Sequence, residues 1–294
     1  MSSPDNPRLE PQPPANADPQ KPPPADPDRV SDPIAPASFT PPASQLLAVE
    51  NPAWNGWDVL LIVALALVTI FVSQLAILLG AHRFLYPHAT LADLALKPIL
   101  LLISQFVVYI AVAACMIMLV EGKYRLPFWS AIRWNWPRSG WRFLVLGTVT
   151  LIGLGALQSV LPMPKDTPFD HLFDRPRDAF LLSAIAVSIG PLMEELFFRG
   201  FLYPVIARRM GVTWGIFLTA LPFGLLHLQQ YGWAWAAGFV IFLVGVVCGA
   251  VRAATKSVGA SFLVHVGYNG AQMLIAIVAT HGFRHVENAM MGWR

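Results

Sequence analysis

Charged residues are scarce in this chain, and their scarcity argues against an ordinary soluble protein. Asp, Glu, Lys and Arg make up 13% of the 294 residues, whereas 55% of the residues are hydrophobic. Soluble domains carry about 25% charged residues. Because the shortage falls in long apolar runs, the sequence predicts a polytopic membrane protein. The net charge of +3 is small and dispersed, so we expect no nucleic-acid partner.

Cysteine is scarce as well. The two cysteines, Cys115 and Cys248, both fall within apolar runs, and neither lies in a CxxC or other ligand spacing. We interpret both as small core residues. They carry no information about the redox compartment.

The first 50 residues differ in composition from the rest. Residues 1–50 hold 14 of the 26 prolines and almost no aromatic residues. Such a segment cannot bury enough apolar surface to order itself, so we predict a disordered tail. No basic stretch leads into an apolar core, which argues against a signal peptide. We therefore divide the chain into a disordered Pro-rich tail, 1–50, and a transmembrane helical domain, 51–294.

Seven stretches are long and apolar enough to span a bilayer, which takes about 20 residues. They are residues 57–80, 98–120, 141–162, 180–206, 212–229, 233–251 and 258–280. The predicted fold is all-α, a membrane bundle of about seven or eight transmembrane helices. Lys and Arg cluster after the second, fourth and sixth spans, which places the N-terminus in the cytoplasm under the positive-inside rule.

The fourth span contains the most unusual feature of the sequence. PLMEELFFRGFLYP, residues 191–204, places Glu194, Glu195 and Arg199 in an apolar segment. A charge at bilayer depth costs about 2.5–3.5 kcal/mol on insertion scales, so something must offset it. Glu195 and Arg199 are four residues apart and can pair on one helical face. Glu194 points elsewhere, and an unpaired carboxylate is a candidate general base.

Two more polar insertions occur at helical spacing. FGLLH places Phe223 four residues before His227, and HVGYN places His265 four residues before Asn269. Carboxylate, two imidazoles and an amide in one bundle suffice to activate water and stabilise an oxyanion. Taken singly, each feature is as readily a helix-to-helix contact as a catalyst. Their combination in three successive segments favours a site.

The relative depth of these residues raises a conflict. Counted along the predicted spans, His227 comes near the outer end of the fifth, while Glu194 and His265 come closer to the inner face. Either the fifth segment is short and tilted, or the fourth breaks at Gly190–Pro191 and restarts with Pro191 in its first turn. In the second case the glutamates would lie near a helix N-terminus. The sequence does not choose between them.

The three motifs together resemble a known family. EELFFR fits EExxxR, FGLLH fits FxxxH and HVGYN fits HxxxN, in the order found in CPBP intramembrane proteases, which include the CAAX proteases and bacteriocin-processing enzymes, also called the Abi family. The resemblance covers about residues 180–275. It implies a helical core with a catalytic cavity inside the bilayer of a bacterial inner membrane. By motif position, Glu194 activates water, Glu195 and Arg199 support it, His227 lies near the water, and His265 and Asn269 hold the oxyanion.

The resemblance also implies a substrate class: a peptide or protein, with a prenylated CAAX-type C-terminus or a leader-type sequence, presented with membrane lipid. The family has been discussed both as glutamate proteases and as metalloproteases. No HExxH occurs here, and we favour a mechanism without metal. If zinc were bound, Glu194, His227 and His265 would be its ligands.

Two rival functions remain open. The chain is alternatively a non-catalytic membrane scaffold or bacteriocin-immunity protein of the same family, which keeps the polar site as a structural core. A transporter with Glu194 as a proton carrier is the third possibility. Against a transporter, the chain shows no internal repeat of the kind that many transporters carry.

Overall fold

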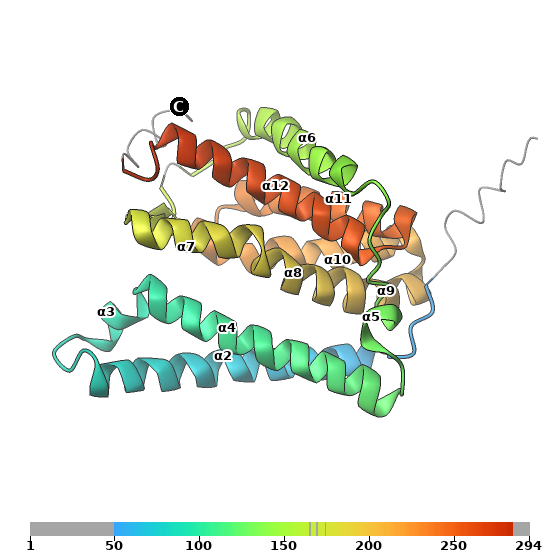
Figure 1. Cartoon of the computed structure of the whole chain (residues 1–294), viewed down its shortest axis with the longest axis horizontal. Helices are drawn as coiled ribbons and strands as arrows, with labels where there is room; N and C mark the ends of the chain where they lie inside the picture. The colour runs from blue at the N-terminus through green and yellow to red at the C-terminus, as the bar shows by residue number, and fades with distance from the viewer. Residues whose placement is uncertain (1–49, 165, 169, 174, 285–294) are drawn as a thin grey trace, which may run out of the picture. The chain divides into compact units, whose positions relative to one another are not determined.

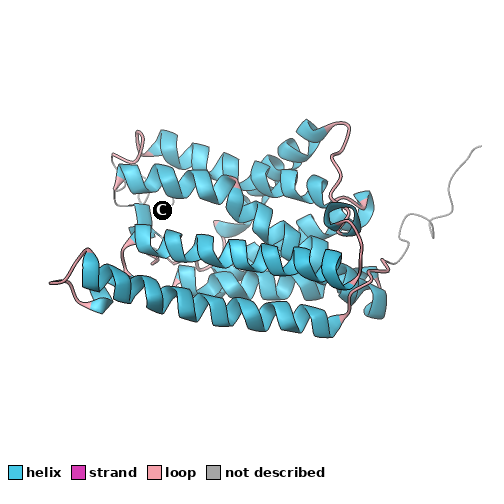
Figure 2. Cartoon of the chain, turned by 60° about the horizontal axis from the view of Figure 1, so that its bottom comes forward, coloured by secondary structure: helices cyan, strands magenta, loops and turns pink. Residues whose placement is uncertain are grey.

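The computed structural model describes residues 50–164, 166–168, 170–173 and 175–284. These residues form helices joined by loops, without any strand among them (Figure 2). Seven helical runs are long and apolar enough to cross a membrane: Gly56–Phe84, Pro98–Lys123, Gly140–Gln158, Pro176–Met210, Val212–Tyr231, Trp235–Thr255 and Val258–Ala279. The predicted all-α integral membrane fold is confirmed. The predicted tail lies outside the described residues, apart from Glu50.

The first two long helices form an antiparallel pair, α2 (Gly56–Phe84) and α4 (Pro98–Ile117), joined through the short α3 (Leu91–Ala95). A capping box between Asn55 and Asp58 starts α2, because each side chain accepts a hydrogen bond from the other's backbone N–H. The Asp58 carboxylate also accepts bonds from Lys123 Nζ (2.6 Å) and the Tyr124 hydroxyl (2.5 Å). These bonds tie the start of α2 to the π-helical segment η1 (Met118–Lys123) that continues α4.

Four of the other five long helical runs pack as two further pairs (Figure 1). They are α6 (Gly140–Gln158) on α12 (Val258–Ala279), and α10 (Val212–His227) on α11 (Trp235–Thr255). The crossing of α6 and α12 is close because Gly147 and Gly267 face the opposite backbone. A Cβ atom on Gly147 would collide with the Val264 carbonyl oxygen, and one on Gly267 with the Leu144 carbonyl oxygen. Small residues permit this approach in membrane helices.

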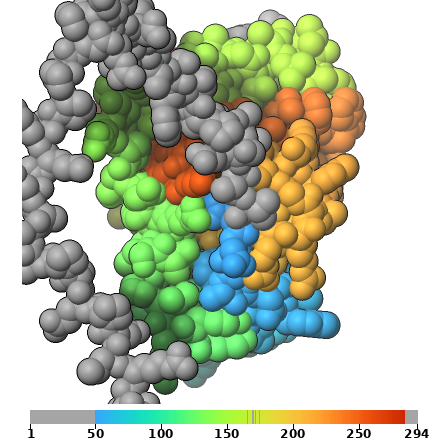
Figure 3. All heavy atoms as spheres, turned by 90° about the vertical axis from the view of Figure 1, so that its right-hand side faces the viewer, coloured from blue at the N-terminus to red at the C-terminus, as the bar shows by residue number. Residues whose placement is uncertain are grey.

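The α2–α4 pair joins the rest of the domain near the start of the described chain. Trp54 Nε1 donates to the Phe201 carbonyl oxygen at 2.8 Å, and the two rings stack with centroids 5.0 Å apart. Four residues before Trp54, the buried Glu50 carboxylate forms one ion pair with Arg133 and another with Arg252, each at 2.9 Å. Figure 3 shows this first segment (blue) lying against green and orange parts of the chain. Glu50, the last residue of the predicted tail, is therefore buried and forms ion pairs within the helical domain.

Candidate active site

The fourth membrane span is not one regular helix. It consists of α7 (Pro176–Val187), α8 (Ile189–Glu195), the π-helical η3 (Leu196–Leu202) and α9 (Tyr203–Met210). The chain breaks at Ser188, whose φ and ψ are −121° and −83°. Pro191 is the third residue of α8, in the first turn, where a missing N–H leaves no helical bond unmade. Of the two alternatives left open by the sequence, the structure shows the break in the fourth span, at Ser188, two residues before Gly190.

The break does not place the glutamates as expected. Glu194 and Glu195 are the last two residues of α8, so the expectation of a helix N-terminus beside them is wrong. The π-helical turn of η3, which contains Arg199, comes directly after them. π-Helical turns are rare and frequently occur at functional sites, because they change the direction of the side chains beyond them.

Glu195 is wholly buried and fully engaged. Its Oε1 lies 2.9 Å from an Arg199 guanidinium nitrogen and 3.0 Å from His265 Nδ1. Its Oε2 accepts a hydrogen bond from the Ser261 hydroxyl at 2.6 Å. Glu195 and Arg199 are both 0% exposed, so the charged pair is shielded from lipid. Their spacing of four residues lets the two side chains meet on one helical face. With three donors around it, this carboxylate has a structural task.

Arg199 is held on several sides. Besides Glu195, its guanidinium donates to the Gly245 carbonyl oxygen on α11 at 2.9 Å. It also lies over the ring of Phe223, 4.7 Å from the centroid. Gly245 begins the run GVVCG, residues 245–249, a GxxxG pattern that is typical of closely packed membrane helices. A Cβ on Gly245 would lie 3.0 Å from Ala220 Cβ on α10, so the helices meet closely there.

Glu194 has a different environment from its neighbour. Its side chain is 25% exposed, and its two oxygens face two imidazoles. Oε1 lies 3.8 Å from His227 Nε2, and Oε2 lies 3.6 Å from His265 Nε2. These distances are longer than hydrogen bonds. The structure thus brings Glu194, His227 and His265 together from three spans, and neither imidazole lies within hydrogen-bonding distance of Glu194.

The hydrogen bond that Nδ1 of each imidazole makes determines which nitrogen of that ring carries the proton when the ring is neutral. His227 Nδ1 lies 2.7 Å from the Phe223 carbonyl oxygen, which only accepts, so Nδ1 carries the proton. His265 Nδ1 faces the Glu195 carboxylate in the same way. When such a ring is neutral, its Nε2 lone pair therefore points toward Glu194. Either ring can accept a proton there, and after protonation it can donate one.

Asn269 is placed less directly than its motif suggests. Its Nδ2 donates to the Ala186 carbonyl oxygen at the end of α7, at 2.7 Å. That bond uses one of its two amide protons and satisfies a carbonyl beside the Ser188 break. The amide therefore anchors α12 to α7 next to the site, with one donor left over.

The depth conflict disappears when the helices are counted from their shared turn at Gly211. Glu194 precedes Gly211 by 17 residues and His227 follows it by 16, so the two residues lie at similar heights on antiparallel helices. The fourth span is 35 residues long, well beyond what a bilayer requires. Counting from its apolar start placed Glu194 wrongly. The break at Ser188 is real, but it was not needed to align the two residues.

Two site residues escaped the sequence analysis. Ser261 binds both Glu195 and the Cys248 carbonyl oxygen, at 2.6 and 2.9 Å. Its signal was available, because Ser261 precedes His265 by four residues, as His265 precedes Asn269. Tyr109 on α4 interacts electrostatically with Glu194. A tyrosine in an apolar run carries no local signal, because its approach to Glu194 depends on how α4 packs against α8.

A different group of potential metal ligands shares His265 with the site. The group consists of three buried residues, Glu195, Cys248 and His265. Each offers one potential ligand atom, and these three atoms lie within 4.8 Å of one another. Glu195 already accepts bonds from Arg199 and Ser261, so a cation there would compete with a guanidinium. This group is therefore a poor metal site.

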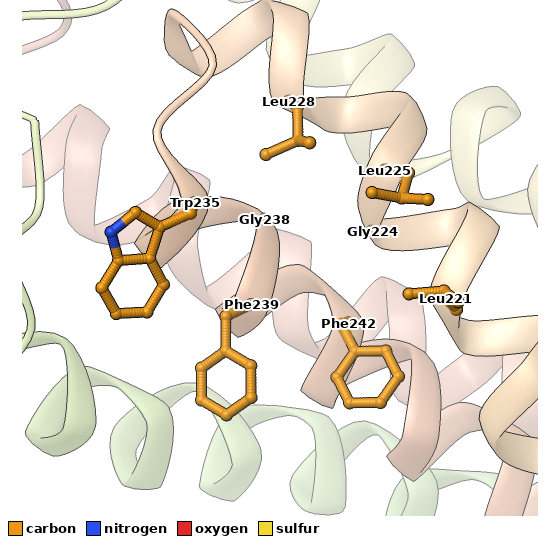
Figure 4. A pocket seen from close by; sticks show the side chains of 8 residues that line it. All are labelled: Leu221, Gly224, Leu225, Leu228, Trp235, Gly238, Phe239 and Phe242. Carbon is orange, nitrogen blue, oxygen red and sulfur yellow. The ribbon is translucent and has the colours of Figure 1, made fainter.

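An apolar pocket of about 270 Å³ lies apart from these polar groups, between α10 and α11 (Figure 4). It is lined by Leu221, Gly224, Leu225, Leu228, Trp235, Gly238, Phe239 and Phe242. None of these side chains can transfer a proton or bind a metal, so the pocket adds no chemistry to the site.

Comparison with known proteins gives one match. Residues 176–271, which are 96 of the 294, match the family model described as Rce1-like, type II CAAX prenyl endopeptidase. A search of curated proteins found no match, and neither did a search of solved structures. The matched residues include Glu194, Glu195, Arg199, His227, His265 and Asn269. The matching model is that of the family which the three motifs indicated, and over residues 176–271 this membrane protein is similar to the Rce1-like type II CAAX prenyl endopeptidases.

Proposed function

We propose that the protein is an intramembrane endopeptidase in which Glu194 activates the attacking water. The observation that supports this most strongly is the contrast between two adjacent carboxylates. Glu195 is 0% exposed and engaged by three donors, whereas Glu194 is 25% exposed and faces two imidazole Nε2 atoms at 3.6 and 3.8 Å. A purely structural polar core would have no need of the second carboxylate. A water-accessible carboxylate beside two imidazoles is suited to general-base work.

The proposed reaction proceeds in two steps. Glu194 takes a proton from water, with His227 Nε2 orienting that water, while the water oxygen attacks the scissile carbonyl carbon. The carbonyl electron pair moves to oxygen, and this oxyanion accepts hydrogen bonds from His265 Nε2–H and Asn269 Nδ2. The intermediate then collapses: the C–N bond breaks, Glu194 returns its proton to the leaving nitrogen, and an amine and a carboxylic acid form, which separate as an ammonium and a carboxylate once the acid proton has passed to the amine.

The charge count of the cluster supports the part assigned to His265. Two carboxylates and the Arg199 guanidinium sum to −1, which is costly in a membrane interior. A second proton on His265 makes the sum zero, and its two nitrogens face Glu195 at 3.0 Å and Glu194 at 3.6 Å. The charged ring is also the form that can donate from Nε2 to an oxyanion. The proposed mechanism therefore uses His265 as a donor to the oxyanion and His227 as the acceptor that orients the water.

A zinc ion is the alternative source of an activated water. Glu194, His227 and His265 would be the ligands of such an ion, because each imidazole Nε2 lies within 3.8 Å of a Glu194 oxygen and both Nδ1 atoms are held by acceptors. Bound zinc would lower the pKa of its water. With both rings neutral and Arg199 present, zinc would leave the cluster at +1. We favour the metal-free site because its charge sums to zero.

We further propose that the substrate is a lipidated peptide, a CAAX-type prenylated C-terminus in particular, with a leader-type peptide as the second choice. The support is the match to a CAAX prenyl endopeptidase family together with a carboxylate located within membrane helices.

The experiment that tests the function compares membrane peptides from cells that make the wild-type protein with those from cells that make Glu194→Gln at equal level. Peptides that arise only with the wild type are expected. Identical peptide sets, with biological function retained by Glu194→Gln, would favour the scaffold or immunity protein.

A further inference from the structure

A tyrosine from outside the matched core approaches the site from the opposite side to α12. Tyr109 lies on α4, which precedes residues 176–271 and is therefore not covered by the family match. Its hydroxyl lies 3.8 Å from the position that a Cβ on Gly190 would occupy. Gly190 is four residues before Glu194 in α8, so the two share one helical face. Tyr109 also interacts electrostatically with Glu194 itself.

The segment beside Glu194 is thus approached by polar side chains from two helices. Asn269 on α12 donates to the Ala186 carbonyl oxygen, four residues before Gly190. The Tyr109 hydroxyl lies beside Gly190, within ordinary van der Waals distance of the position that a Cβ would occupy there. The Tyr109 hydroxyl therefore lies against the face of α8 that carries Glu194.

The oxyanion donors of the family motif are already partly engaged in this chain. One amide proton of Asn269 already forms a hydrogen bond to the Ala186 carbonyl oxygen. His265 can donate from Nε2 only when it carries a second proton, because its Nδ1 proton is held by Glu195. A phenol needs no such condition, because its hydroxyl carries a proton at all physiological pH values. A third donor would make oxyanion stabilisation independent of the His265 proton.

We propose that Tyr109 is a further catalytic residue, whose hydroxyl donates a hydrogen bond to the substrate carbonyl oxygen as it becomes an oxyanion. This rests on the proposed peptidase function and adds a donor from α4 to it. No covalent step changes: the phenol keeps its proton and only shares it with the oxyanion. The substrate chain then lies between α4 and α8, with Glu194 and Tyr109 on either side of the scissile carbonyl.

The test uses the purified full-length protein in proteoliposomes, with the peptide substrate identified from the comparison of wild type and Glu194→Gln. Tyr109→Phe removes the hydroxyl and keeps the ring. Loss of one oxyanion donor lowers kcat by roughly 10²–10³-fold, and KM is expected to stay unchanged because the bond forms in the transition state. The matched control is Tyr268→Phe, a buried membrane tyrosine on α12 that packs with Leu151 and Val264 and is expected to retain wild-type kcat.

Each outcome decides a different point. If Glu194→Gln and the wild type give the same products, the peptidase function fails and the role of Tyr109 fails with it. If Glu194→Gln is inactive and Tyr109→Phe keeps kcat within twofold of wild type, only the role of Tyr109 is overturned. A rise in the KM of Tyr109→Phe at unchanged kcat also overturns the role of Tyr109, because such a change indicates that the hydroxyl contacts the bound substrate but does not stabilise the transition state further. Rates are normalised to the folded fraction, so a loss of stability cannot imitate a loss of catalysis.

Discussion

The two adjacent glutamates should respond in opposite ways to the same truncation. Glu195→Ala removes the partner of a guanidinium that is 0% exposed, along with the acceptor for Ser261 and His265. Breaking a buried pair on one side costs about 3–5 kcal/mol, because the remaining charge is left without compensation. Glu194→Ala removes a carboxylate that is 25% exposed and has no contact with these imidazoles closer than 3.6 Å. Its cost should stay below about 1 kcal/mol.

The measurement is the free energy of unfolding in mixed micelles, followed by tryptophan fluorescence during a titration with denaturing detergent. Arg199→Ala should resemble Glu195→Ala. The double variant should cost less than the sum of the two single variants, with a coupling of about 1–3 kcal/mol, because neither charge is then left alone. If Glu195→Ala proves as mild as Glu194→Ala, the division between a structural and a free carboxylate is mistaken.

Three further outcomes are expected from the same contacts. Ser261→Ala should lower stability by about 1.5–3 kcal/mol in the same titration, because it removes a hydrogen bond to a charged, buried carboxylate; no change would remove Ser261 from the network. Gly147→Ala should lower the free energy of unfolding by about 1–3 kcal/mol, because the added Cβ collides with α12. Gly153→Ala is the control and should not lower it, because the space at its Cβ position is open. Equal effects of the two substitutions would contradict the close crossing of α6 and α12. Elemental analysis and chelator treatment of active protein should find no stoichiometric zinc and no loss of activity, and zinc lost together with activity would defeat the metal-free mechanism.

Local pattern was sufficient to predict the spans and the charged pair. Seven apolar stretches correspond to seven membrane-length helical runs because the bilayer requires about 20 apolar residues and internal backbone bonding from each. Glu195 and Arg199 pair because spacing four survives even at the start of a π-helical turn. Pro191 marked the break because proline is accommodated in a first turn.

The features that the sequence could not supply depend on packing between segments. The depth of Glu194 relative to His227 is set by the turn at Gly211 and by the extra length of the fourth span, which apolar composition does not reveal. Tyr109 approaches Glu194 only because α4 packs near α8. Ser261 is an exception, because its spacing of four from His265 was visible and was overlooked among ordinary membrane serines.

The central claim is that Glu194 performs the chemistry while Glu195 holds the structure. The most direct measurement is the rate at which purified Glu194→Gln, in proteoliposomes, releases the peptides that the wild type releases, taken together with its free energy of unfolding. The account predicts wild-type stability and a rate lower by roughly 10²–10⁴-fold, as expected for the loss of a general base. A wild-type rate in this folded variant would contradict it.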